Sequence, residues 1–289
     1  MERNSRTFAT SRPALLGVAV VFTLATSVAA AEVGHGPSRP ASEVPSYAPS
    51  YAPSSAANVG RAGRGRTRTQ PLGTTADVVA DGRSARIGAL FTADRADDLA
   101  GGHSCTASVV HSPQRDLVVT AAHCVSDTST DLVFVPGYRD GHAPYGVWKL
   151  DHRYLPDGWT KDQDQDSDLA FATVDETDGK AIEDVVGANL FTPGTATGAT
   201  AVTVVGYPNS RETPITCTNK PTSYSSTQQR IECPAFSQGT SGSPWINDAG
   251  QVVGVLGGYD QGGDTDDVSY SVTLGSEAAD LYKSAISDQ

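Results

Sequence analysis

The chain has 289 residues, with 21 basic and 33 acidic side chains and a formal net charge of −12 at pH 7. A surface with this excess of negative charge repels nucleic-acid phosphates, which argues against nucleic acid as a partner. The length is sufficient for one two-lobed core once the leading segments described next are set aside.

The first 31 residues have the three-part layout of a secretory signal. Arg3, Arg6 and Arg12 precede an apolar run over residues 14–26, and small residues follow at positions 28–31. The apolar run is too short for a membrane anchor, since crossing a bilayer takes roughly 20 residues. We therefore expect residues 1–31 to be a signal peptide, and the mature protein to be secreted into the extracellular space and free of the membrane.

Residues 32–76 form a low-complexity segment. Pro, Ser, Ala and Tyr recur in it, as in PSYAPSYAPSS (residues 45–55), and a basic run follows over residues 61–68. Such a composition cannot bury enough apolar surface to offset the entropy lost when the chain becomes ordered. We expect a disordered pro-segment or linker here, followed by one domain over residues 77–289.

The pattern after this segment predicts many short β-strands, separated by Gly, Pro, Asn and Asp. They are expected at residues 87–92, 105–110, 117–120, 132–135, 169–174, 201–206, 252–256 and 268–272. Only the C-terminus indicates a helix, with Ser276 as a candidate N-cap and one apolar face formed by Leu281, Tyr282, Ala285 and Ile286. The pattern predicts an all-β protein, either antiparallel barrels or a sandwich, and not βαβ units.

Four cysteines lie in the expected domain: Cys105, Cys124, Cys217 and Cys233. An even number in an exported chain predicts disulfides. Three pairings are compatible with the sequence; nearest-neighbour pairing would close two short loops, and each bridge would stabilise the fold by about 3 kcal/mol. No C-x-x-C or H-x-x-x-H spacing occurs, so neither a metal nor another cofactor is expected.

The strongest motif is VTAAHC, residues 119–124. Its small alanines leave room for the imidazole of His123. The motif closely resembles the histidine box of trypsin-like serine peptidases, in which the histidine is catalytic. In that family the cysteine after the histidine bonds to a strand shortly upstream, so the resemblance implies a bridge between Cys124 and Cys105.

Four aspartates alternate in the next motif, DQDQDSDLAFA, residues 162–172. A carboxylate that orients a catalytic imidazole has to be buried, and only Asp168 directly precedes an apolar strand. DLAF also resembles the aspartate box of the same family. We expect Asp162, Asp164 and Asp166 on a solvated loop. A Ca²⁺ site there is the alternative, although the glycine and glutamate of an EF-hand loop are missing.

The third motif is QGTSGSP, residues 238–244. A serine nucleophile needs a tight, glycine-bearing turn that exposes its Oγ, with backbone N–H groups aimed at the developing oxyanion. Ser241 fits this role, and the N–H groups of Gly239 and Ser241 are the expected oxyanion donors. Ser243 lacks a glycine two residues before it. The segment resembles the G-x-S-G-S-P box of the bacterial branch that includes glutamyl endopeptidases, and VVGYP (residues 204–208) and the position of Cys233 agree with that branch.

The order His123, Asp168, Ser241 along the chain disfavours the α/β-hydrolase fold, in which serine comes first and histidine last. The family resemblance covers the chain from about Ile87 to the C-terminal helix. It implies two six-stranded antiparallel β-barrels followed by a C-terminal α-helix, with the site in the cleft between the barrels. It also implies that His123 and Asp168 come from the first barrel and Ser241 from the second.

The chain departs from the family at two places that bear on activation and specificity. Thr240 replaces the aspartate that pairs with a newly cut N-terminus in mammalian members, so this activation switch is not expected. Ala235 stands where trypsins carry the aspartate that binds Arg or Lys, so trypsin-like specificity is not expected either.

The strand that lines the substrate pocket in the family corresponds to GVLGGY, residues 254–259. It lacks the histidine found there in glutamyl endopeptidases, so specificity for glutamate is unsupported. Phe236 and Leu256 predict an apolar or restricted pocket. Gly257 and Gly258 form either an edge that pairs with an extended substrate or a turn after the strand.

These features predict a secreted serine endopeptidase. Ser241 is the expected nucleophile, His123 the general base and then acid, and Asp168 the residue that orients His123. The expected partner is a protein or peptide substrate, and the mature chain is expected to be a monomer. The alternatives are a catalytically inactive protease fold that serves as a binding module, and an esterase with the same three residues.

Overall fold

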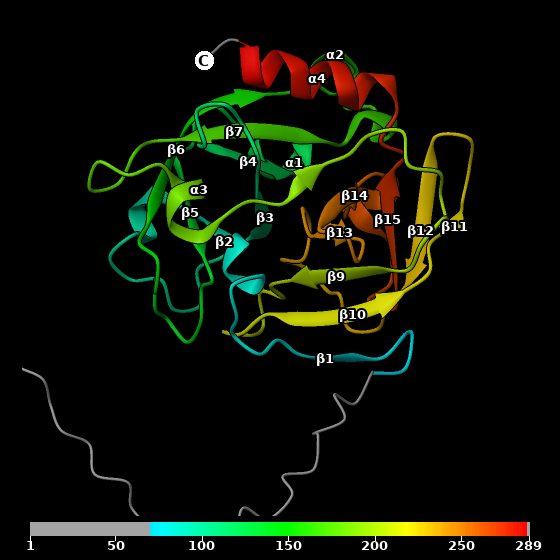
Figure 1. Cartoon of the computed structure of the whole chain (residues 1–289), viewed down its shortest axis with the longest axis horizontal. Coiled ribbons are helices and arrows are strands. Elements are labelled where there is room, and N and C mark those ends of the chain that lie inside the picture. Colours follow the sequence, from blue (N-terminus) through cyan, green and yellow to red (C-terminus); the bar gives the residue numbers. More distant parts are fainter. Residues whose placement is uncertain (1–69, 288–289) are drawn as a thin grey trace, which may run out of the picture. The chain divides into compact units, whose positions relative to one another are not determined.

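The computed structural model describes residues 70–287 (Figure 1). The expected signal peptide and residues 32–69 of the expected pro-segment lie outside the described residues. Strand β1 (Thr75–Asp77) pairs with β10 (Ile215–Asn219), and Thr75 lies opposite Cys217. The domain boundary expected at Asp77 therefore falls inside a paired strand, and the fold begins at least two residues earlier.

The first lobe is a closed antiparallel barrel of six strands. In barrel order these are β2 (Ile87–Thr92), β3 (Cys105–Val110), β4 (Leu117–Thr120), β7 (Ala170–Val174), β6 (Trp148–Tyr154) and β5 (Leu132–Pro136). Five of them were predicted. Strand β6 was not, because Asp, His and Arg interrupt its apolar alternation at a register shift between Leu150 and Arg153.

Six further strands surround the core of the second lobe: β9 (Val202–Gly206), β10, β12 (Gln228–Glu232), β13 (Pro244–Ile246), β14 (Gln251–Val255) and β15 (Val268–Val272). Short strands β8 (Leu190–Phe191) and β11 (Thr222–Ser223) extend its sheets.

Hydrogen bonding divides this lobe into the sheets β1-β10-β9-β13-β14-β8 and β11-β12-β15. At one seam the Ser271 hydroxyl accepts from the Val255 N–H at 3.0 Å, in place of a backbone carbonyl. At the other seam, between β10 and the end of β12, lies a disulfide. The strands of this lobe are arranged as the predicted six-stranded barrel, but the hydrogen-bond ladder between neighbouring strands is interrupted at two places.

Both disulfides have the nearest-neighbour pairing. Cys105 is bonded to Cys124, and Cys217 to Cys233, with sequence separations of 19 and 16 residues. The first bridge joins β3 to the short helix α1 (Ala122–Val125). Closing loops of this length stabilises a fold by about 3 kcal/mol each, because the unfolded chain loses conformational freedom.

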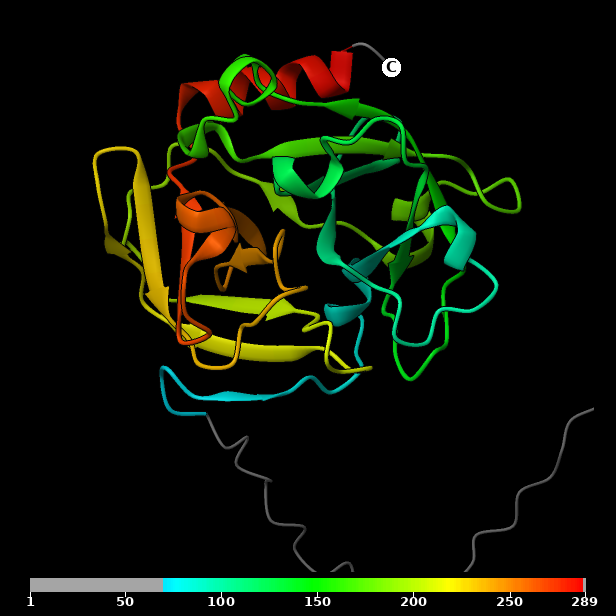
Figure 2. The same ribbon diagram turned by 180° about the vertical axis from the view of Figure 1, so that it is seen from behind.

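The C-terminal helix α4 (Ser276–Ser287) packs on the outside of the first barrel, alongside β7 (Figures 1 and 2). Its buried face carries Ala278 and Ala285, with Tyr282 against the ring of Phe171. The predicted apolar face is confirmed. Ser276, however, is the first residue of the helix and not its N-cap.

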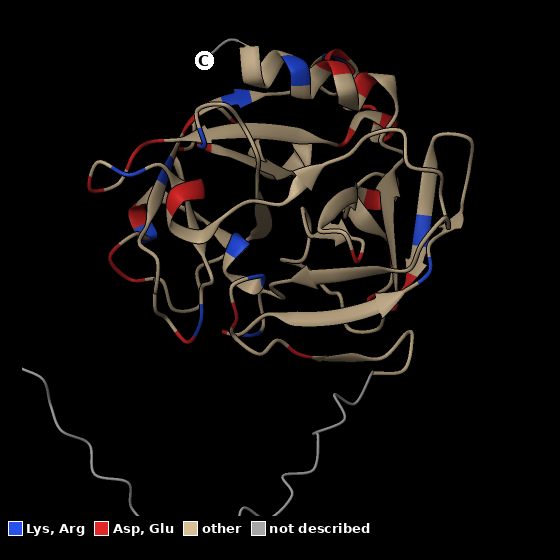
Figure 3. Ribbon diagram, viewed as in Figure 1, with Lys and Arg blue, Asp and Glu red and all other residues tan. Residues whose placement is uncertain are grey.

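The remaining helices are short. They are α2 (Asp157–Asp162), α3 (Ile182–Val186) and the 3₁₀ turns η1 (Ser84–Arg86), η2 (Ala93–Arg95), η3 (Gln165–Ser167) and η4 (Tyr259–Gly262). Across residues 70–287, no helix has the length and apolar character needed to cross a membrane. Asp and Glu residues lie on loops and helices of both lobes (Figure 3).

Candidate active site

His123 and Asp168 are in direct contact. His123 lies in α1 just after β4, and Asp168 lies before β7, the strand that pairs with β4. His123 Nδ1 is 2.8 Å from Asp168 Oδ2, and the His123 backbone N–H donates to Oδ1 at 3.0 Å. Asp168 is fully buried, while the His123 side chain is 12% exposed. A buried carboxylate in this position holds an imidazole in one orientation and one tautomer.

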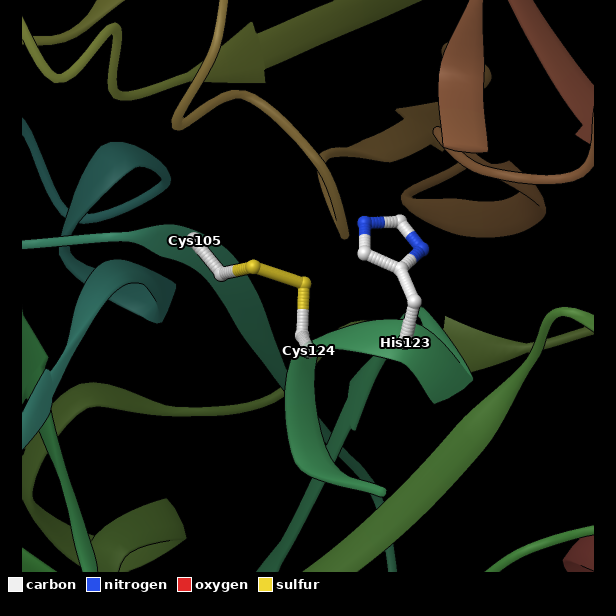
Figure 4. A group of neighbouring side chains, drawn as sticks. All are labelled: Cys105, His123 and Cys124. Atoms are coloured by element: carbon white, nitrogen blue, oxygen red, sulfur yellow. A yellow bond between two sulfur atoms is a disulfide. The ribbon is translucent and has the colours of Figure 1, made fainter. Parts of the chain in front are cut away.

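A disulfide lies beside the imidazole of His123. The potential ligand atoms of Cys105, His123 and Cys124 lie within 4.8 Å of one another. Both sulfur atoms are used in the Cys105–Cys124 bond, and the imidazole lies beside it (Figure 4). Because a thiolate is the form of cysteine that binds metal, this cluster does not form a metal site. The bond instead anchors α1 to β3.

The glycines predicted as a substrate edge lie against Asp168. The Gly258 N–H donates to Asp168 Oδ2 at 2.8 Å, and a Cβ on Gly257 would lie 2.8 Å from the same oxygen. The Gly257 N–H donates to Tyr270, and the Tyr259 N–H to Gln228. Since these three N–H groups are all used within the protein, they offer an extended substrate no donor in this conformation.

The turn around Ser241 requires its two glycines. Gly239 and Gly242 have φ angles of +94° and +85°. A Cβ on Gly239 would lie 2.5 Å from the backbone N of Asn209, and one on Gly242 would lie 2.0 Å from the carbonyl of Thr106. Within residues 70–287, the N–H groups of Gly239 and Ser241 donate to no protein acceptor. The turn therefore leaves free the two donors expected for an oxyanion.

Thr106, on β3 of the first lobe, clamps this turn from behind. Its N–H donates to the Ser241 carbonyl at 2.7 Å, and its hydroxyl donates to the Gly239 carbonyl at 3.0 Å. These bonds fix the carbonyls of both residues and leave their N–H groups unpaired. Thr106 also follows Cys105, whose disulfide partner follows His123, so the clamp brings the Ser241 turn next to the histidine. No motif in the sequence indicates this role of Thr106.

The Ser241 hydroxyl donates to the carbonyl of Gln261 at 3.3 Å. No hydrogen bond joins it to His123 in the part of the chain that the structure describes. Gln261 lies in η4, where it and Asp260 have left-handed φ angles of 55° and 46°. A catalytic serine and its base often form their hydrogen bond only in the substrate complex, so this geometry is compatible with the roles expected for Ser241 and His123.

A cavity of about 280 Å³ borders Ser241. Phe236 and Leu256 line it as predicted, whereas Ala235, Gly257 and Gly258 are not among its lining residues. The prediction of an apolar pocket is incomplete, because η4 and the loop after it contribute aspartates to the wall: Asp260, Asp264 and Asp266. Of the residues that the structure describes, no Lys, Arg or His lines this cavity.

The three aspartates expected on a solvated loop are all exposed, as predicted. Asp162 ends α2, and Asp164 caps η3 by accepting from the Asp166 N–H. The Asp166 carboxylate accepts from Gln228 at 2.7 Å. Among the described residues these three carboxylates form no cluster able to hold an ion, so the Ca²⁺ alternative has no support.

The buried ring of His103 supports the far side of the Ser241 turn. His103 is 4% exposed, and its Nε2 lies 3.0 Å from the carbonyl of Pro208. Burial lowers the pKa of His103, so the ring is neutral and donates from Nε2. Asn209, the next residue, donates to Gln238 at 2.8 Å. His103 thus holds the loop of Pro208 and Asn209, which contacts Gln238, the residue before Gly239.

Comparison with known proteins agrees with this geometry. Residues 105–255, just over half of the chain, match the family model of the trypsin-like peptidase domain. The chain belongs to this family. As a trypsin-like peptidase it is a serine protease. A search of curated protein sequences finds no match.

Solved structures of serine proteases share the fold of this trypsin-like peptidase. Protease Anisep from Arthrobacter nicotinovorans is 26% identical, with a TM-score of 0.61, over 72% of this chain and 98% of that one. The thermostable serine protease AL20 from an extremophilic microorganism is 26% identical, with a TM-score of 0.61, over 72% of this chain and 100% of that one. A Glu endopeptidase solved in complex with MPD is 20% identical, with a TM-score of 0.59, over 74% of this chain and 97% of that one. At this level of identity the similarity shows only that the two proteins share a fold.

Proposed function

We propose that this trypsin-like peptidase is a secreted endopeptidase that cleaves peptide bonds through an acyl-enzyme on Ser241. The observation that carries the proposal is the buried Asp168–His123 pair beside a serine turn with two free N–H groups. Each part matches a step of acyl transfer: a base held in place, an exposed nucleophile and donors for the oxyanion.

In the proposed reaction, Ser241 first exchanges its hydrogen bond to Gln261 for one to His123. Oγ then attacks the substrate carbonyl while His123 Nε2 takes its proton, and Asp168 stabilises the imidazolium. The N–H groups of Gly239 and Ser241 donate to the carbonyl oxygen as it becomes an oxyanion. His123 next gives the proton to the leaving amine, and water releases the acyl group by the same steps in reverse.

Export of the mature enzyme is supported by the same structure. Disulfides form and persist in oxidising compartments, and all four cysteines of the chain are paired. This agrees with the signal peptide expected over residues 1–31.

A fluorophosphonate probe tests the proposal directly. We expect one probe per molecule, located on Ser241 by mass spectrometry, together with cleavage of internal bonds in a mixed peptide pool. A folded protein that takes no label would be a binding module and would contradict the proposal. Labelling with ester hydrolysis but no peptide cleavage would identify an esterase instead.

The acidic wall of the cavity predicts how substrates rank by the charge of the residue before the scissile bond. Phe236 and Leu256 can contact an aliphatic stem, while the carboxylates of Asp260, Asp264 and Asp266 attract a cation and repel an anion. We expect kcat/KM for lysine or arginine at this position to exceed that for glutamate by at least about tenfold, which corresponds to about 1.4 kcal/mol.

The measurement is a set of peptides that differ only at this position, with a leucine peptide as the neutral reference. Because salt screens exposed charges, the preference should shrink at 1 M ionic strength, where the Debye length falls to about 3 Å. A glutamate peptide cleaved as fast as the lysine peptide would show that these aspartates do not set the preference.

A further inference from the structure

Gln228 is a buried glutamine whose side chain joins two segments of the site. It begins β12 and is 5% exposed. Its Nε2 donates to Asp166 Oδ1 at 2.7 Å and lies 3.4 Å from the carbonyl of Gln165. Its Oε1 accepts from the Tyr259 N–H at 2.9 Å. The donor end of the amide therefore bonds to the segment before Asp168, at Asp166, and the acceptor end bonds to the segment that contains Tyr259.

The two segments meet at the carboxylate of Asp168. Asp166 lies two residues before it in the first lobe. Tyr259 follows Gly258, whose N–H donates to Asp168 Oδ2 at 2.8 Å in a contact that comes from the second lobe. The approach is close, since a Cβ on Gly258 would lie 2.8 Å from Gln228 Oε1. A change in the Gln228 amide therefore displaces residues on both sides of the carboxylate.

We propose that Gln228 is a positioning residue for the reaction. By fixing Asp166 and Tyr259, it sets the direction in which Asp168 faces His123 Nδ1, although it touches none of the reacting atoms. A displacement of about 1 Å at such a distance from the chemistry can lower turnover by about 10²-fold. The inference rests on the proposed function of His123, Asp168 and Ser241.

The neighbouring Gln229 provides a matched control. It lies on the same strand and is 4% exposed. Its Nε2 donates to the Val253 carbonyl at 3.1 Å, and its Oε1 accepts from the Thr197 hydroxyl at 3.2 Å. Successive side chains point to opposite faces of a strand, and the contacts of Gln229 involve no residue of the site. Its loss removes an equally buried amide without disturbing Asp168.

The test compares Gln228→Leu with Gln229→Leu. Both variants lose buried hydrogen bonds, so both should unfold at a lower urea concentration. Only Gln228→Leu should lower kcat, by about 10- to 100-fold, with little change in KM. The fluorophosphonate labelling rate should fall in parallel.

A rescue experiment separates positioning from packing. Gln228→Glu removes the donor and places a second carboxylate beside Asp166, so it should be at least as slow as Gln228→Leu. Adding Asp166→Asn restores a donor and acceptor pair between the two side chains and should recover most of kcat. If Gln228→Leu fails to fold, this pair of variants still tests whether Gln228 positions Asp168.

Equal losses of kcat in Gln228→Leu and Gln229→Leu, or no recovery in the double variant, would overturn the positioning role. A wild-type protein that neither labels nor cleaves peptides would overturn the proposed function, and the positioning role with it. The two failures are therefore distinguishable.

Discussion

Ser241→Ala is expected to lower kcat on a cleavable peptide by about 10⁶-fold and to abolish fluorophosphonate labelling. The substitution removes the one atom that forms the acyl-enzyme. It leaves the free N–H groups of Gly239 and of residue 241 in place, so binding and the oxyanion donors should support a residual rate above that in water. The measurement is single-turnover kinetics with a peptide substrate, alongside a thermal melt to show that the variant is folded.

Ser243→Ala is the matched control for this result. Ser243 is fully buried, and its hydroxyl has no hydrogen-bond partner in the part of the chain that the structure describes. Its removal should leave kcat within a few-fold of the wild type. If Ser243→Ala abolished activity while Ser241→Ala retained it, the assignment of the nucleophile would be wrong.

Asp168→Asn is expected to lower kcat by about 10⁴-fold with a small change in KM. The carboxylate accepts three hydrogen bonds, from the His123 N–H, from His123 Nδ1 and from the Gly258 N–H. An amide of the same shape has one oxygen and an NH₂ group, so it cannot accept all three. It also favours the imidazole tautomer with the proton on Nε2, which cannot accept the proton of Ser241.

Asp162→Asn provides the comparison for this variant. Asp162 belongs to the same run of alternating aspartates but is exposed at the end of α2. The Asp162→Asn variant should therefore cleave peptides at the wild-type rate. Similar losses in the two variants would indicate a general effect of charge, and Asp168 would then not be the residue that orients His123.

The sequence predicted strand bounds most accurately where the strand is buried along nearly its whole length. The bounds predicted for β2, β3, β4 and β15 match the structure. The interruptions between the sheets of the second lobe were not predicted, because they depend on a Ser271 side chain that replaces a backbone acceptor. Such replacements leave no periodic signal in a sequence.

The candidate site was predicted in part for similar reasons. Asp168 was chosen from four aspartates because an apolar strand follows it, and it is indeed fully buried. Thr106 and Gln228 were missed, since each lies in an ordinary strand and reaches the site through contacts between distant segments. The acidic cavity wall was missed because the fold alone decides which side of residues 260–266 faces the cavity.

The geometry of the candidate site depends on the Cys105–Cys124 bond, and therefore on the redox state of the compartment in which the protein folds. It joins the residue before Thr106, which clamps the Ser241 turn, to the residue after His123, so one covalent link supports both halves of the reacting pair. In a reducing cytosol both cysteines would remain thiols, and the Ser241 turn and His123 would lack the covalent bond that supports both. For the proposed secreted enzyme we therefore expect no proteolysis in the cytosol of the producing cell, because the Cys105–Cys124 bond forms only in an oxidising compartment.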